Sequence, residues 1–394
     1  MKKTIIVLAS ALLLASSAFA QEPAKAQLKW YGFVRNYLVY DSHASSAGTE
    51  DLFYYMPLDN DEKGTTNFVA LTSRLGVDVT GYEVEGYKIG AKIETDFYNK
   101  NSQVAVLRLR QAYMTIAKDN FNWKIGQAWH PMAADLPDIF SLESAAPFGP
   151  FSRTPQATFD YSLGNGSSLT ASAIWMMQYT SNGPEGSSAN YIKYSGIPEL
   201  YLAYNAKSEH NLLRVGVDMV NTKPYKKTDG LHTTFNAYIY EQYSNNGWNI
   251  KNKLTFAQDG SHFNLVGGYG VTAASAGSDK FEYAFTSNVS DWMTITCKKN
   301  KHWAPAILLG YIKTFAASED IDPALYWAKL NAGSVNQMIR VQPEIVYNLG
   351  KLAIGWEYMM TTVQYGKSDA RKAVTDDLHW VTNNRLQMMV KYTF

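Results

Sequence analysis

Hydrophobic and polar residues alternate along much of this chain, most clearly at its carboxyl end. In a β-strand, successive side chains point to opposite faces, so residues 385–394 would form a strand with two distinct faces. One face carries Leu386, Met388, Val390, Tyr392 and Phe394, and the other carries Arg385, Gln387, Met389, Lys391 and Thr393. The same period of two recurs throughout the chain and predicts an all-β protein.

Sixteen segments follow this pattern. They are residues 28–40, 67–80, 86–98, 104–118, 121–129, 155–163, 167–178, 198–206, 209–220, 231–243, 247–257, 289–298, 303–316, 336–348, 351–363 and 381–394. Short, turn-like connections alternate with connections that are mostly long. An even strand number, short turns at one end, long loops at the other and a terminal aromatic residue are typical of antiparallel transmembrane β-barrels of bacterial outer membranes. We therefore predict a barrel of about 16 strands.

One region leaves the strand count open. Residues 262–270 and 281–287 could each form a strand, but we assign both to a single long loop at 258–288 because one extra strand would break the even count. If both were barrel strands, the total would be eighteen.

The amino terminus resembles a secretory signal. Two lysines precede an apolar run at residues 5–14, and small residues suitable for cleavage follow at residues 18–20. We predict a signal peptide at 1–20 and an outer-membrane barrel domain at 21–394. The longest later apolar run is about nine residues, whereas a spanning helix needs roughly 20. A chain of this kind enters a membrane only as a closed barrel.

The alternation also predicts which side chains face the lumen. In strand 67–80, we expect Val69, Leu71, Leu75, Val77 and Val79 to face lipid, opposite Thr72, Arg74, Asp78 and Thr80. In strand 104–118, Leu107, Leu109 and Tyr113 oppose Arg108 and Arg110 in the same way. In strands 209–220 and 336–348, the predicted lumenal residues are Arg214, Asp218, Arg340, Gln342 and Glu344.

The predicted lumenal faces are strongly basic, although the whole chain has a net charge of only +1. Their 15 basic residues are Lys29, Arg35, Arg74, Lys88, Lys92, Arg108, Arg110, Lys124, Arg214, Lys251, Lys253, Lys298, Arg340, Arg385 and Lys391. Their 7 acidic residues are Asp78, Glu94, Asp96, Asp160, Asp218, Glu344 and Glu357. The surplus of eight positive charges predicts a lumen that attracts anions.

Six of these basic residues come from the last predicted strand and the first four, which are neighbours in a closed barrel. We call them the basic wall: Arg35, Arg74, Lys92, Arg108, Arg110 and Arg385. Basic rings in a pore lower the electrostatic barrier for anions. Alternatively, the wall pairs with lumenal carboxylates and only braces the barrel. The surplus of basic residues predicts that some of them stay unpaired.

The third long connection, residues 130–154, is too apolar for a loop in water and too rich in proline for a strand. We predict that it folds into the lumen, where its acids Asp135, Asp138 and Glu143 would lie across from the basic wall and form a constriction with a transverse field. The alternative is an outer loop that packs at a subunit interface.

Other functions find little support. None of the seven histidines lies in the context of a catalytic triad, and no phosphate loop, clustered metal ligands or nucleic-acid motif appears, so we expect no enzyme activity, no catalytic residues, no cofactor, no metal and no nucleic-acid partner. Adhesion or glycan binding through the external loops is the alternative to a channel.

The predicted architecture resembles the trimeric general porins of Gram-negative outer membranes. Within that group, residues 72–77 and 108–113 are similar to the corresponding strands of DcaP-like and phosphate-selective O/P-like porins. The resemblance implies an outer-membrane homotrimer that contacts lipid and passes small anionic or polar solutes. It differs in one respect, since only residues 21–27 precede the first strand, whereas some DcaP-like proteins begin with a coiled coil.

Overall fold

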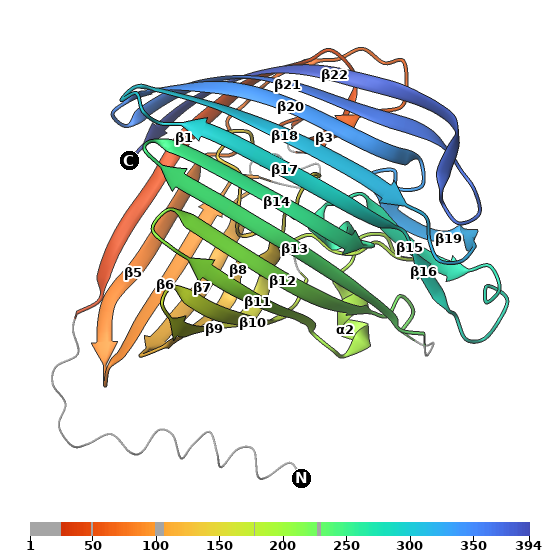
Figure 1. Cartoon of the computed structure of the whole chain (residues 1–394), viewed down its shortest axis with the longest axis horizontal. Helices are drawn as coiled ribbons and strands as arrows, with labels where there is room; N and C mark the ends of the chain where they lie inside the picture. Colours follow the sequence, from red (N-terminus) through yellow and green to blue (C-terminus); the bar gives the residue numbers. More distant parts are fainter. Residues whose placement is uncertain (1–24, 49, 99–105, 177, 227–229) are drawn as a thin grey trace, which may run out of the picture.

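The computed structural model describes residues 25–48, 50–98, 106–176, 178–226 and 230–394. The predicted signal peptide lies outside these ranges. The chain forms a closed antiparallel barrel (Figure 1), as predicted. Its strands are β1 (Gln27–Asp41), β4 (Thr66–Val69) with β5 (Arg74–Val84), β6 (Tyr87–Asp96), β7 (Arg108–Lys118), β8 (Phe121–Trp129), β9 (Arg153–Gly164), β10 (Ser167–Ile174), β11 (Glu199–Lys207), β12 (Asn211–Thr222), β13 (His232–Asn245), β14 (Trp248–Gln258), β17 (Ser287–Cys297), β18 (Trp303–Phe315), β20 (Val335–Leu349), β21 (Leu352–Ser368) and β22 (Val374–Thr393).

The predicted count of sixteen is confirmed, because β4 and β5 are two parts of one barrel strand and both pair with β1. The barrel closes where β1 pairs with β22, with Arg35 opposite Lys391. At this seam the terminal Phe394 donates its backbone N–H to the carbonyl oxygen of Gly32 at 3.0 Å. The short turns and the carboxyl terminus lie at one end of the barrel, and the longer loops lie at the other end (Figure 1).

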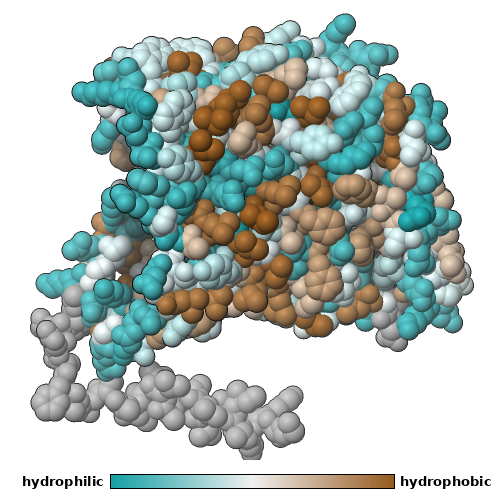
Figure 2. Space-filling view, viewed as in Figure 1, coloured by the Kyte–Doolittle hydropathy of each residue, from teal (hydrophilic) through white to brown (hydrophobic). Residues whose placement is uncertain are grey.

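The outer surface is apolar. Figure 2 shows hydrophobic side chains gathered over the strands, with polar side chains along the two ends of the barrel. Near the turn end, exposed aromatic residues include Trp30, Trp123, Trp248, Trp303 and Tyr392. Aromatic residues of this kind gather at the membrane interfaces of outer-membrane barrels. No helix among the described residues is long and apolar enough to cross a membrane.

Side-chain facing follows the prediction in β12 and β20 but not throughout β4 and β7. Val69 was predicted to face lipid, and this is wrong: it is 3% exposed and packs inside the barrel against Tyr37. The strand is interrupted at residues 70–73, and this break shifts the alternation by one residue, so Phe68 takes the outer face.

A β-bulge causes the second difference. Glu94 pairs with Gln111 and Thr95 pairs with Leu109, so Arg110 is an extra residue in β7. Beyond the bulge the facing is inverted. Tyr113, predicted to face lipid, instead lies in the lumen beside Lys124, and this prediction is wrong.

The loop at 258–288 does contain strands, but they are not part of the barrel. β15 (Gly267–Thr272) pairs with β16 (Tyr283–Phe285) and with β19 (Ile321–Lys329), forming a separate sheet beyond the loop end of the barrel (Figure 1). The remaining elements are β2 (Ser45–Gly48), β3 (Phe53–Pro57), α2 (Asn190–Ser195) and the 3-10 turns η1 (Pro131–Ala133) and η2 (Ser261–Phe263).

The third loop, residues 130–152 in the structure, folds into the barrel as predicted. Two wall glycines make room for its aromatic rings. An added Cβ at Gly310 would lie 2.7 Å from Cγ of Phe148, and one at Gly355 would lie 2.7 Å from Cε1 of Phe140. Both distances are below van der Waals contact, so any larger residue at either position would push the loop away from the wall.

Candidate functional site: the lumenal constriction

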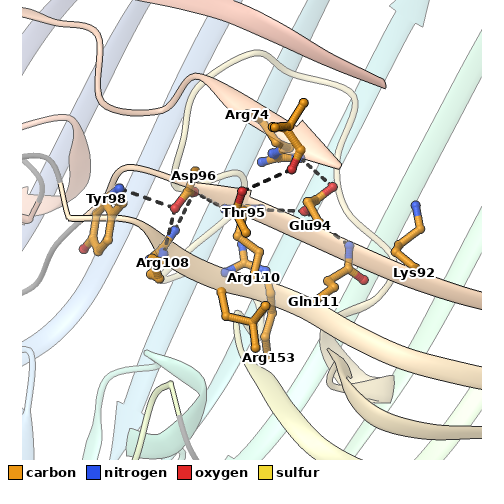
Figure 3. A network of polar contacts seen from close by, with 12 residues as sticks. Arg74, Lys92, Glu94, Thr95, Asp96, Tyr98, Arg108, Arg110, Gln111 and Arg153 are labelled. Carbon is orange, nitrogen blue, oxygen red and sulfur yellow. Dashed lines mark hydrogen bonds and ion pairs between the residues drawn. The ribbon is translucent and has the colours of Figure 1, made fainter. Parts of the chain in front are cut away.

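The centre of the candidate site is a buried ion-pair network on β6 and β7 (Figure 3). Arg110 is 3% exposed and donates to two carboxylates, from Nε to Glu94 at 2.8 Å and from Nη1 to Asp96 at 2.7 Å. Alternation along β7 points Arg108 and Arg110 inward beside the two acids of β6, and the bulge adds Gln111, whose Nε2 donates to Glu94 at 3.3 Å.

Further arginines surround the same two acids. Arg108 binds Asp96 with both arms of its guanidinium, at 2.9 and 2.7 Å, and lies over the ring of Tyr98. Arg74 approaches Glu94 at 3.5 Å. Planar two-point pairing of this kind fixes the orientation of a guanidinium more tightly than a single charge contact. The network therefore holds three arginines in place with two carboxylates.

Three more cations flank the network, and no carboxylate lies in ion-pair contact with them among the described residues. Arg35 donates to Thr72 at 3.1 Å and lies between the rings of Phe33 and Tyr37. Lys391 lies over the ring of Phe33. Arg153 is buried and donates to Gln178 at 2.7 Å. Six basic residues form what we call the cationic group: Arg35, Arg74, Arg108, Arg110, Arg153 and Lys391. Within the described part of the chain, Glu94 and Asp96 are the carboxylates paired with this group, which leaves four positive charges uncompensated.

The other two members of the predicted basic wall lie in different surroundings. Lys92 pairs with Asp78 at 3.0 Å and with the hydroxyl of Tyr31 at 3.2 Å. Arg385 is fully buried, pairs with Asp41 at 2.7 Å, and donates to the backbone carbonyl of Asp51 at 2.6 Å. Arg385 is therefore an anchor beneath the first loop and offers no surface to a passing solute.

The acids of the third loop contact basic residues on the half of the barrel that supports the loop, not the basic wall. The pairs are Asp135 with Arg214 at 2.9 Å, Asp138 with Lys251 at 2.7 Å, and Glu143 with Arg340 at 3.8 Å. Burial raises the pKa of the Glu143 carboxyl, although the charge of Arg340 opposes this effect. Because each acid has a cation beside it, the loop adds little negative field to the lumen.

The first loop, described at residues 42–48 and 50–65, also enters the barrel, and this was not predicted from the sequence. Tyr54 of β3 is buried between the guanidinium groups of Arg340 and Arg385. The Cζ atoms of these two arginines lie 5.2 and 4.4 Å, respectively, from the centroid of the Tyr54 ring. Arg340 also donates to the carbonyl of Tyr55 at 2.8 Å. The sequence feature that could have predicted this entry is the apolar run at residues 52–58, which, like the third loop, is too apolar to lie in water.

Comparisons with known proteins agree with this architecture. The family model described as DcaP outer membrane protein matches residues 16–147, a range that includes the segments 72–77 and 108–113. The crystal structure of the outer membrane channel DcaP of Acinetobacter baumannii is similar over 96% of this chain and 100% of its own, with 20% identity and a TM-score of 0.73. A search of curated protein sequences finds no match.

Two further structures are similar at lower identity. The anion-selective porin from Comamonas acidovorans matches 94% of this chain and 100% of its own, with 10% identity and a TM-score of 0.62. OmpT of Vibrio cholerae, in its trimer form, matches 94% of this chain and 99% of its own, with 12% identity and a TM-score of 0.55. The similarity to these solved structures shows the fold, a closed antiparallel β-barrel.

Arg153 belongs to the cationic group but is not among the predicted wall residues. The sequence pattern places the start of this strand at residue 155 and so leaves Arg153 in the third loop. The structure begins β9 at Arg153, whose guanidinium packs on the rings of Trp129 and Phe151. No local pattern marks this residue, since it approaches the β7 arginines only when β8 and β9 are in register.

Proposed function

We propose that this barrel is a passive diffusion channel for small hydrophilic solutes that prefers anions. The observation that carries the proposal is the cationic group at the constriction, where six basic side chains face two carboxylates. A fixed positive field in a narrow, low-dielectric passage lowers the barrier for anions and raises it for cations.

The contacts of the third loop also support a preference for anions. A constriction with basic residues on one side and unpaired acids on the other would have a transverse field and a weaker net preference for anions. Here Asp135, Asp138 and Glu143 already have cationic partners on the supporting strands. The basic group therefore dominates the field along the passage. We propose Arg35, Arg74, Lys92 and Arg108 as the wall residues closest to permeating solutes, since their side chains stay partly exposed.

The test is ion selectivity in a planar lipid bilayer. Refolded protein inserted under a potassium chloride gradient is expected to give a reversal potential that favours chloride over potassium. A clear preference for potassium would overturn the assignment of the cationic group to the passage. Liposome swelling with matched anionic, neutral and cationic solutes would then identify the class of solute that enters fastest.

We also propose that three copies assemble in the outer membrane, as the OmpT structure is described as a trimer. Light scattering of the detergent-purified protein, corrected for bound detergent, should give three times the mass of one chain. A monomeric mass under conditions that preserve channel activity would contradict this assembly.

A further inference from the structure

Four buried side chains with metal-binding chemistry converge near the loop end of the barrel, away from the cationic group. Glu199 is the first residue of β11, Asp218 lies on β12, His130 starts the third loop, and His262 lies in η2 after β14. Donor atoms of His130, Glu199 and Asp218 all lie within 4.8 Å of one another. Nε2 of His262 is 3.6 Å from Oε1 of Glu199.

Several of these donor atoms have no hydrogen-bond partner among the described residues. They are Oε2 of Glu199, Oδ1 of Asp218 and both ring nitrogens of His262, and all three side chains are at most 2% exposed. Two adjacent carboxylates repel each other, and burying polar atoms without partners is costly. A cation between them would remove both penalties.

The hydrogen bonds of His130 define its role. Its Nδ1 accepts from the backbone N–H of Met132 at 3.1 Å, so in the neutral ring the proton is on Nε2. That Nε2 is 2.6 Å from Oε1 of Glu199 and donates to it. A donating nitrogen does not bind a metal, so His130 orients the carboxylate of Glu199, as hydrogen-bonded partners commonly do for metal ligands.

We propose that Glu199 and Asp218 bind one divalent transition-metal cation of the Zn²⁺ type, and that the His262 imidazole, which lies beside Glu199, turns toward this cation as its third ligand. His130 is the residue that positions Glu199. A set of one imidazole and two carboxylates suits Zn²⁺, which accepts nitrogen and oxygen ligands and often keeps one position for water. Ca²⁺ and Mg²⁺ prefer all-oxygen sites with more ligands. The sequence shows no clustered metal ligands, because these residues are far apart along the chain and meet only in the folded barrel.

The position of the site gives it a structural consequence. Glu199 and Asp218 belong to the barrel wall, whereas His262 belongs to the loop that carries β15 and His130 begins the third loop. A bound cation would join this external loop to the wall at the point where the third loop enters the lumen. The bound protein should therefore have a more rigid constriction than the metal-free protein.

The test uses the full mature chain, refolded in detergent and stripped with a chelator. Zinc titration followed by dialysis and elemental analysis is expected to retain one Zn²⁺ per chain, and Co²⁺ should give a visible absorption band typical of a protein-bound site. The variants Asp218→Asn and His262→Ala should each lower the affinity at least 100-fold. His130→Gln should lower it by 10- to 100-fold, as expected when a partner of a metal ligand is lost.

The matched control is His302→Ala, which removes a histidine at the turn end of the barrel, where Nδ1 contacts the carbonyl of Asn348. This variant should bind Zn²⁺ as tightly as the wild type. Equal Zn²⁺ affinity in the wild type, Asp218→Asn and His262→Ala would overturn the proposal. A loss of Zn²⁺ affinity in His302→Ala as large as that in the site variants would also overturn it. If a site variant does not refold, the wild type alone tests the proposal, because a wild type that retains no Zn²⁺ and shows no Co²⁺ band would overturn it.

Discussion

Neutralising Arg35 offers a direct test of the electrostatic mechanism. Arg35 lies on β1 beside the network, stays partly exposed, and has no carboxylate in ion-pair contact among the residues that the structure describes. Arg35→Gln keeps a donor for Thr72 and removes one positive charge. Because no acid loses its partner, the change alters the field without leaving a buried carboxylate unpaired.

The expected size follows from Coulomb's law. A unit charge about 10 Å from a permeating ion in water contributes 332/(80 × 10), or about 0.4 kcal/mol. Removing it slows anions about twofold and speeds cations about twofold, because about 1.4 kcal/mol corresponds to a factor of ten. The chloride-to-potassium permeability ratio should therefore fall about fourfold at low salt, and the effect should shrink as the Debye length shortens to about 10 Å at 0.1 M.

The assay is the reversal potential of single channels in a planar bilayer, measured at two ionic strengths. Lys301→Gln is the matched control, because it removes the same charge from an exposed turn outside the lumen. A fourfold change in Arg35→Gln with no change in the control supports the mechanism. An unchanged permeability ratio in Arg35→Gln, at low salt and with normal conductance, would place the selectivity filter elsewhere.

Three other perturbations test the network and the third loop. Asp96→Asn should destabilise the barrel by about 3–5 kcal/mol, because it leaves Arg108 and Arg110 without a shared carboxylate. Urea unfolding in detergent measures this loss of stability. A loss below about 1 kcal/mol would mean that the network contributes little to stability. Gly310→Val should displace Phe148 and lower the free energy of unfolding by about 1–3 kcal/mol. Because the loop then moves, single-channel conductance should be larger and noisier than in the wild type. An unchanged conductance would refute this packing. Burial opposes ionisation of Asp138, but the hydrogen bond and charge of Lys251 outweigh it and hold the pKa of Asp138 below its ordinary value. A carboxyl with a lowered folded-state pKa stabilises the protein above about pH 4 and loses that contribution as the pH falls. Acidification should therefore lower the urea midpoint of the wild type more than that of Lys251→Met, and equal slopes would contradict the ion pair.

The alternation of residues along the chain determined the class of fold. Outward side chains must be apolar and inward ones mostly polar, so a period of two recurs in each strand, and the even count follows from a closed barrel with both ends on one side. The entry of the third loop into the lumen was also predictable, because Phe148 and its neighbours need an apolar surface. Residues 52–58 are equally apolar, and they too pack inside the barrel, so the entry of the first loop was predictable for the same reason.

The tertiary structure alone decided which charges meet. The bulge at Arg110 inverts the facing of β7, and the break at residues 70–73 shifts that of β4, so strict alternation fails at these points. Arg153 reaches the network across two strands, and Asp135 and Asp138 find partners on β12 and β14 rather than on the basic wall. The side of the barrel wall that a side chain faces is a local property of its strand, and it follows a period of two that can be read from the sequence. Pairing between side chains depends on strand register and on the path of a loop across the lumen, which bring together residues that are far apart along the chain.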